Sequence, residues 1–257
     1  MNPSWRRVIV ALAVAWPAAA CEPILGPSRV DSNWRVVDTP HFSLNVRPGS
    51  FAEQNAATLG EVLEDQYAYT ARVLEFSYAG RVSMFLYNSA ADADMGSDHS
   101  GSAYPDTEAV RATCVPPLDG SLFGLLSHES NHVIQQNGLG RPATYFVLEG
   151  LPSAVLSERY HSRGKTFLYS WTASHDAQIP PLSNLIDDDK WSSHDQQIAY
   201  NASASFLAYL LEVNGPSRLK QLLPVNSKDF ARKFEEVYSS SLEEAERAWR
   251  AFCAGHR

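Results

Sequence analysis

Short stretches suited to strands alternate with longer amphipathic stretches in the first half of the chain. Apolar and polar residues alternate over residues 34–46, as in strands with one buried face. Residues 52–74 have the apolar spacing of a long helix. The apolar run 82–87 and the stretch 108–114 have the length and composition of strands. This half is therefore predicted to be a mixed α/β unit.

Helical spacing dominates the second half of the chain. Apolar residues recur at helical intervals over residues 121–137, and the pattern stops at Asn137-Gly138, as helices commonly do. A second apolar helical pattern begins near Glu149 after a short connection, which makes the two helices antiparallel neighbours. The polar stretches 88–106 and 174–193 are predicted to be loops.

Length and hydrophobic content fit one folded domain. Of the 257 residues, 44% are hydrophobic, which is enough for a proper core. We predict the α+β class, with a single domain over residues 34–257. Its N-terminal lobe, about 34–137, combines strands and helices, and its C-terminal lobe, about 138–257, is helical.

The first residues match an export signal. Two arginines precede the apolar run 8–16, and small residues follow up to Cys21, so residues 1–20 are predicted to be a signal peptide. The run is too short for a transmembrane span. The alanines before Cys21 favour a bacterial lipobox, with Cys21 acylated and residues 21–33 forming a tether to the membrane. The same alanines also suit ordinary cleavage, so a secreted protein is the alternative.

Two cysteines remain when Cys21 is set aside. Export would place Cys114 and Cys253 in an oxidising compartment, which predicts one disulfide between them. A pair of free buried thiols is the alternative.

The charge balance argues against nucleic acid as a partner. The chain carries 21 Lys and Arg against 29 Asp and Glu, for a formal net charge of −8. It also has no basic cluster and no glycine-rich phosphate loop. We therefore expect no nucleic-acid binding.

The most specific chemistry lies in the helical stretch 121–137. His128, Glu129 and His132 spell His-Glu-x-x-His, and two histidines four residues apart on a helix can converge on one metal ion. Glu129, beside the first histidine, is placed to act as general base on a metal-bound water. A catalytic zinc usually has three protein ligands, and Glu149, acidic among apolar neighbours, is the candidate for the third.

Each of these features also has a plain structural interpretation. The two histidines can be ordinary exposed or hydrogen-bonded residues. Glu149 can be a helix-start residue that the helix dipole favours. The pattern by itself therefore leaves both interpretations open.

The motif and its surroundings resemble the gluzincin zinc metallopeptidases, and within them the small bacterial peptidase MA-like proteins. The similarity comprises the pentapeptide 128–132, then the Glu-Gly-Leu of segment 146–151. It continues through a helix that starts with Ala-Tyr, at 199–216, to a closing helix at 241–252. It extends over about 36–253.

This resemblance implies a zincin-like, thermolysin-like fold whose active-site cleft lies between the two lobes. It implies a hydrolase that cleaves peptide bonds with Zn²⁺ as cofactor. His128, His132 and Glu149 would bind the zinc, and Glu129 would be the catalytic general base.

Further roles follow from the resemblance. Tyr200 would stabilise the oxyanion, although a tyrosine of the core or rim is the alternative, and His175 or His194 could take that part instead. The strand before the active helix would pair with the backbone of an extended substrate, unless it is an internal strand. Its candidate substrate contacts are Ala109, Val110, Arg111 and Ala112.

Two residues depart from the family pattern. Ser153 stands where thermolysin-like relatives carry an Asp that orients a ligand histidine, and Asn131 is unusual inside the motif. Support around the ligands is therefore expected to be weaker or differently placed.

Together these features predict a zinc-dependent metallopeptidase in the bacterial envelope. It would act on peptides or proteins and be lipid-anchored at a periplasmic or extracellular face. The alternative is a non-catalytic or weakly active envelope lipoprotein that uses the same fold for binding or assembly. The sequence does not disclose the substrate or the oligomeric state.

Overall fold

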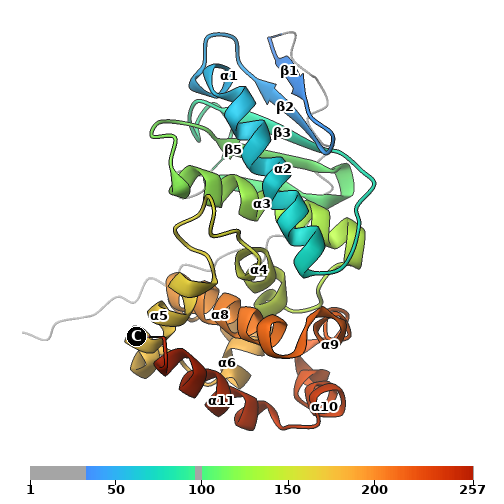
Figure 1. Ribbon diagram of the computed structural model, residues 1–257, viewed down its shortest axis with the longest axis vertical. Coiled ribbons are helices and arrows are strands. Elements are labelled where there is room, and N and C mark those ends of the chain that lie inside the picture. The colour runs from blue at the N-terminus through green and yellow to red at the C-terminus, as the bar shows by residue number, and fades with distance from the viewer. Residues whose placement is uncertain (1–32, 96–99, 257) are drawn as a thin grey trace, which may run out of the picture.

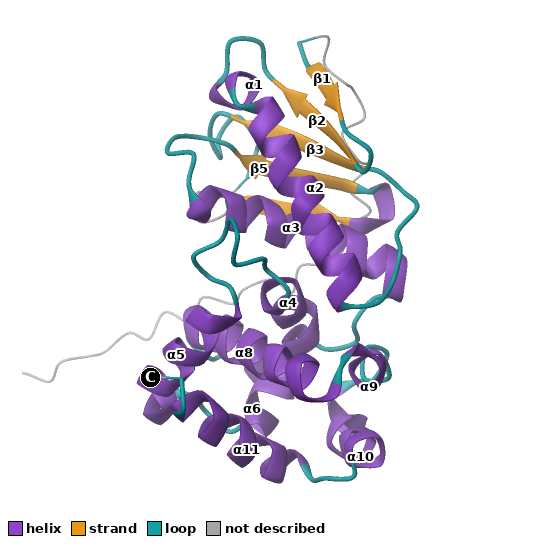
Figure 2. Ribbon diagram, viewed as in Figure 1, coloured by secondary structure: helices purple, strands orange, loops and turns teal. Residues whose placement is uncertain are grey.

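The computed structural model describes residues 33–95 and 100–256. The predicted α+β class is confirmed, because a single five-stranded sheet in the first half is followed by helices (Figures 1 and 2). The predicted signal peptide and Cys21 lie outside the described residues, as does all but the last residue of the predicted tether. None of the described helices combines the length and apolar character that a membrane span requires.

The strands form one mixed sheet in the order β1-β2-β3-β5-β4. The pairs β2/β3 and β3/β5 are parallel, and the two outer pairs are antiparallel. The strand β4 at one edge lies inside the stretch predicted to be a loop, so that prediction was wrong there; its four half-buried residues have no alternating pattern. The strands are β1 Arg35–Asp38, β2 Phe42–Val46, β3 Val82–Tyr87, β4 Gly101–Tyr104 and β5 Ala109–Thr113.

Helices α1 Phe51–Gln54, α2 Ala56–Val73 and α3 Gly120–Leu139 accompany the sheet, and α2 and α3 cover one of its faces (Figure 1). Their apolar sides pack onto the inward side chains of β2, β3 and β5. The fully buried members of this core include Leu44, Leu59, Leu63, Val82, Met84, Val110, Val133 and Ile134.

The helical half is built around α8, which buries residues on most of its surface. Helix α4 packs against it closely, because Gly150 leaves room: a Cβ there would lie 2.9 Å from side-chain atoms of Ser203 and Leu207. Fixing α4 on α8 and α3 at once sets the position of Glu149. The helices are α4 Tyr145–Ala154, α5 Lys165–His175, α6 Leu182–Ile186, α7 Asp188–Trp191, α8 Gln196–Asn214, α9 Pro216–Lys220, α10 Ser227–Tyr238 and α11 Leu242–Ala254, with short 3-10 turns η1 Pro105–Thr107 and η2 Asp176–Gln178.

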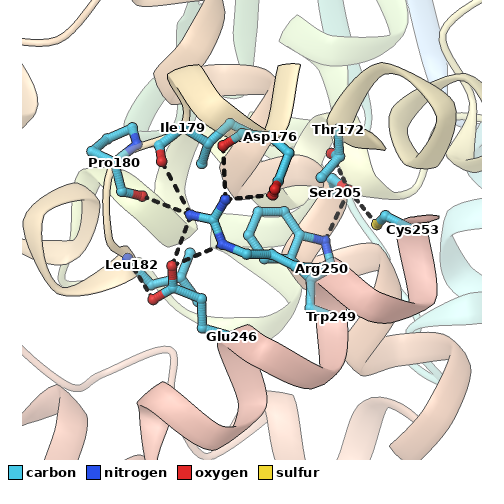
Figure 3. A network of polar contacts seen from close by, with 10 residues as sticks. All are labelled: Thr172, Asp176, Ile179, Pro180, Leu182, Ser205, Glu246, Trp249, Arg250 and Cys253. Atoms are coloured by element: carbon cyan, nitrogen blue, oxygen red, sulfur yellow. Dashed lines mark hydrogen bonds and ion pairs between the residues drawn. The ribbon is translucent and has the colours of Figure 1, made fainter. Parts of the chain in front are cut away.

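Arg250 of α11 orders the long connection between α5 and α8 (Figure 3). Its guanidinium pairs with Asp176 at 2.6 Å and Glu246 at 2.8 Å. It also donates to three main-chain carbonyls of the connection, and these hydrogen bonds hold the connection in place. This stretch was predicted to be a loop, but it contains the short helices α6 and α7. These carbonyls belong to Asp176, Ile179 and Pro180.

The predicted disulfide is wrong, because Cys114 and Cys253 are both buried and unbonded. Cys114 belongs to the core under the sheet and Cys253 to the core of the helical half, where its Sγ lies 3.7 Å from Ser205 Oγ (Figure 3). An even cysteine count gives no information on which core each thiol joins. Burial raises the pKa of Cys114 to about 12 and that of Cys253 to about 11, which keeps both as unreactive thiols.

Candidate metal centre

Two adjacent helices present the three predicted ligands to one another. Helix α3 is capped by Asp119, whose carboxylate accepts from the backbone N–H of the first turn. Four residues apart on this helix, His128 and His132 face α4. Glu149 meets them from α4, which begins at the side-chain cap of Thr144.

The ligand atoms form a small triangle. The two Nε2 atoms of His128 and His132 lie 3.0 Å apart, and Glu149 Oε2 lies 3.6 and 3.4 Å from them respectively. Ligands that bind one ion tetrahedrally with bonds of about 2.1 Å are themselves about 3.4 Å apart. The triangle therefore has the size of a single metal site, and these three side chains are the one such group within residues 33–95 and 100–256.

The electrostatics of Glu149 suit a ligand. Its side chain is 17% exposed, and burial by itself raises its pKa. The hydrogen bonds and charges of His128 and His132 outweigh burial, so the pKa of Glu149 falls far below its usual range. The site thus holds an ionised carboxylate in front of two imidazoles.

Ser153 supports the first histidine. Its Oγ lies 2.9 Å from His128 Nδ1, on the side of the ring away from the triangle. When Nδ1 carries the ring proton and donates a hydrogen bond to this hydroxyl, Nε2 is left with the lone pair that a metal needs. The expected orienting position is therefore occupied by a neutral acceptor in place of a carboxylate.

Asn131, the other unusual residue of the motif, ties three helices together. Its Nδ2 donates to the Pro152 carbonyl of α4 at 3.1 Å, and its Oδ1 accepts from Thr70 of α2 at 3.0 Å. Gln66 extends this series of hydrogen bonds by donating to Thr70 Oγ1 at 2.8 Å and to the Val155 carbonyl. All three side chains are buried, so this network fixes α3 against α4 beside the ligand triangle.

Sequence reasoning missed this network. A polar residue on the buried side of the motif helix, and the spacing of Gln66 and Thr70 one turn apart in α2, were its only local signals.

The triangle opens into a cleft of about 1230 Å³ that Glu129 and Tyr200 also line. Strand β4 approaches α3 so closely that a Cβ on Gly101 would lie 2.7 Å from Glu129 Cγ. The ring of Tyr200 has its centroid 6.3 Å from that of His128. Burial and the negative charge of Glu149 raise the pKa of Tyr200, which keeps its phenol protonated as a hydrogen-bond donor.

His175 and His194 are not among the residues that line this cleft. His175 stacks on Trp171 with ring centroids 4.4 Å apart. His194 follows α7 and its Nε2 has no partner among the described residues. Of the residues considered for oxyanion stabilisation, Tyr200 is the one that the structure brings to the triangle.

The predicted substrate-binding strand requires a correction. Strand β5, with Ala109, Val110, Arg111 and Ala112, is internal, because β3 pairs with one of its edges and β4 with the other. None of these four residues lines the cleft, whereas residues 100–107 do. Strand β4, which precedes β5 in the chain, thus takes the rim position that was predicted for β5.

Comparison with known proteins adds no family. No protein-family model matches the chain, and a search of curated proteins finds no match. The site itself consists of a three-residue group able to hold a metal, with a carboxylate and a phenol in the same cleft.

Proposed function

We propose that the protein is a zinc-dependent peptidase of the gluzincin type. The observation that carries this proposal is the triangle of His128, His132 and Glu149 with the Glu129 carboxylate in the same cleft. Two imidazoles and one carboxylate form a ligand set that catalytic zinc uses in metallopeptidases, with a further position left for water. The spacing of the ligand atoms fits zinc bond lengths.

Zinc, when bound, supplies a water of lowered pKa and polarises the scissile carbonyl. Glu129 then acts as general base, accepting the proton of that water and returning it to the leaving amine. The Tyr200 phenol donates a hydrogen bond to the oxygen on which negative charge develops. Ser153 acts through His128 by holding its ring in one tautomer.

A zincin-like arrangement accounts for the cleft. In this proposal the N-terminal lobe, about 34–137, supplies β4, η1 and α3, and the C-terminal lobe, about 138–257, supplies α4 and α8. The edge strand β4 would pair with the backbone of an extended substrate, because an edge offers unpaired N–H and C=O groups along one side. The substrate contacts are accordingly reassigned from β5 to β4.

Export and lipidation at Cys21 belong to the proposal as well. They rest on the sequence of residues 1–33 alone. They would place the cleft at the periplasmic or extracellular face of the envelope.

Metal analysis and cleavage assays test the proposal together. The chain from residue 22 onward should contain about one zinc per molecule and cleave members of a peptide library. Glu129→Gln should abolish cleavage while keeping zinc, and Glu149→Ala should lose zinc. A protein that binds zinc yet cleaves nothing would support the alternative of a non-catalytic envelope lipoprotein. Absence of zinc from the wild type would contradict the zinc-dependent peptidase.

A further inference from the structure

Two arginines line opposite ends of the cleft. Arg163 lies at the end that also includes Ser121, in the first turn of α3. Its neighbour Ser162 packs against this turn, since a Cβ placed on Gly120 would lie 3.2 Å from the backbone N of Ser162. Arg141 follows the last turn of α3 at the other end. The ligand triangle lies between them on the same helix.

Arg163 brings a permanent positive charge to its end of the cleft. Its guanidinium lies over the ring of Phe167, 6.0 Å from the centroid. Among the residues that the structure describes, it forms no ion pair with a carboxylate. The nearby carboxylate of Asp119 is occupied as the cap of α3, accepting from Ser121 and Leu122. A guanidinium keeps its charge at any physiological pH and favours carboxylate partners.

The direction of β4 decides which part of a peptide would reach Arg163. Gly101, at the start of the strand, lies beside Glu129, and the carbonyl of Pro105, just after its end, accepts from Asn137 of α3. Strand and helix therefore run the same way. A peptide paired antiparallel to β4, the more stable pairing, runs in the opposite direction. Its C-terminal part then points toward the first turn of α3 and Arg163.

The distance along the cleft limits the position of the group that is bound. Ser121 precedes Glu129 by about two helical turns, or about 12 Å along the axis. An extended peptide covers that distance in about four residues. Leu125 lies between these two residues on α3, and Leu156 and Leu168 also line the cleft, which suits apolar side chains of a substrate.

We propose that Arg163 binds a carboxylate of the substrate, located on the C-terminal side of the scissile bond and within about four residues of it. This inference rests on the proposed peptidase function and names its substrate class: peptides with apolar residues after the cleaved bond, followed by a carboxylate. The carboxylate is either the C-terminus of the peptide or an Asp or Glu side chain.

Matched peptides test the proposal. One pair differs only in a C-terminal acid or amide three residues after the cleaved bond, and a second, amidated pair differs in Glu or Gln at that position. Wild-type protein should cleave the acid or Glu peptide with kcat/KM about tenfold above its neutral match, less so at high salt. Arg163→Gln should remove the preference. The matched control Arg141→Gln, at the opposite end of the cleft, should keep it.

Binding separates this inference from the peptidase proposal. Calorimetry with the zinc-loaded Glu129→Gln variant measures Kd for the same peptides without cleavage. Cleavage of charged and neutral peptides at equal rates, or a preference that survives in Arg163→Gln, would overturn the carboxylate site and leave the peptidase standing. Tighter binding of the charged peptides to Glu129→Gln, lost in the double variant Glu129→Gln/Arg163→Gln, would support the carboxylate site. If the wild type cleaves nothing while this binding preference is present, only the peptidase proposal is overturned. Absence of both preferences overturns the carboxylate site.

Discussion

Ser153 Oγ lies 2.9 Å from His128 Nδ1, so the helix that presents Glu149 also orients the imidazole opposite that carboxylate. Ligand and orienting group stand one turn apart on α4. A shift of this helix would change the third ligand and the support of the first ligand together.

Removing the Ser153 hydroxyl should weaken metal binding. Ser153→Ala leaves the ring of His128 free to rotate and should raise the Kd for zinc by about tenfold, since groups that orient a ligand contribute on this scale. Competition with a chromophoric chelator measures the change. Ser153→Asp, which supplies a stronger acceptor, is the matched variant and should bind zinc at least as tightly as the wild type. Equal affinity in all three proteins would remove Ser153 from this role.

Cutting the buried network should destabilise the fold. Asn131→Ala removes the acceptor of the Thr70 hydroxyl and the side-chain donor to the Pro152 carbonyl, which should lower the free energy of unfolding by about 3 kcal/mol. Urea unfolding of the metal-free protein measures this loss. In a double-mutant cycle, Thr70→Val should cost less in the Asn131→Ala background than in the wild type. Additive effects would show that the two residues do not act as a pair.

Gly101 should be sensitive to a single methyl group. Gly101→Ala places a Cβ 2.7 Å from Glu129 Cγ, so either the carboxylate or β4 must move. We expect cleavage to fall by about tenfold or more with zinc content unchanged. Gly124→Ala is the control, because it lines the same cleft and its Cβ would meet nothing within 4 Å. A Gly101→Ala variant as active as this control would contradict the close approach.

Stability should depend on pH through His161. This side chain is 4% exposed, its Nε2 lies 2.9 Å from Gln66 Oε1, and burial lowers its pKa to about 4. Between pH 6.5 and 4 the unfolded chain binds a proton that the folded chain does not, so stability decreases as the pH falls through this window.

His161→Gln isolates that contribution. From pH 7 to pH 5 the wild type should lose about 2 kcal/mol more than the variant, measured by urea unfolding with chelator present so that metal release does not contribute. Parallel pH profiles would mean that His161 titrates normally in the fold.

The ligand triangle was predictable because its determinants are local. His128 and His132 are placed by helix geometry alone, and Glu149 follows on the next helix after a short connection. The strand order was not predictable in this way. In the sheet, β5 pairs with β3 and β4 lies at the edge beyond β5, although β4 comes before β5 in the chain. No pattern within residues 88–114 indicates this difference between the order in the chain and the order in the sheet.

Contacts between distant segments were likewise hidden. Asn131 and Thr70 are 61 residues apart, and each is an unremarkable polar residue until α2 and α3 pack. The cysteines failed as a guide for the same reason. Pairing depends on which core each thiol joins, and composition does not encode that.

The unpaired state of Cys114 and Cys253 has a practical side. Within the described residues the fold contains no covalent cross-link, so a reducing cytosol should fold this domain as well as an oxidising compartment does. With zinc held by His128, His132 and Glu149, as we propose, a dithiol reductant would compete with these ligands for the metal, because thiolates are themselves zinc ligands. A phosphine reductant in place of a dithiol would keep purified material reduced while leaving its metal content interpretable.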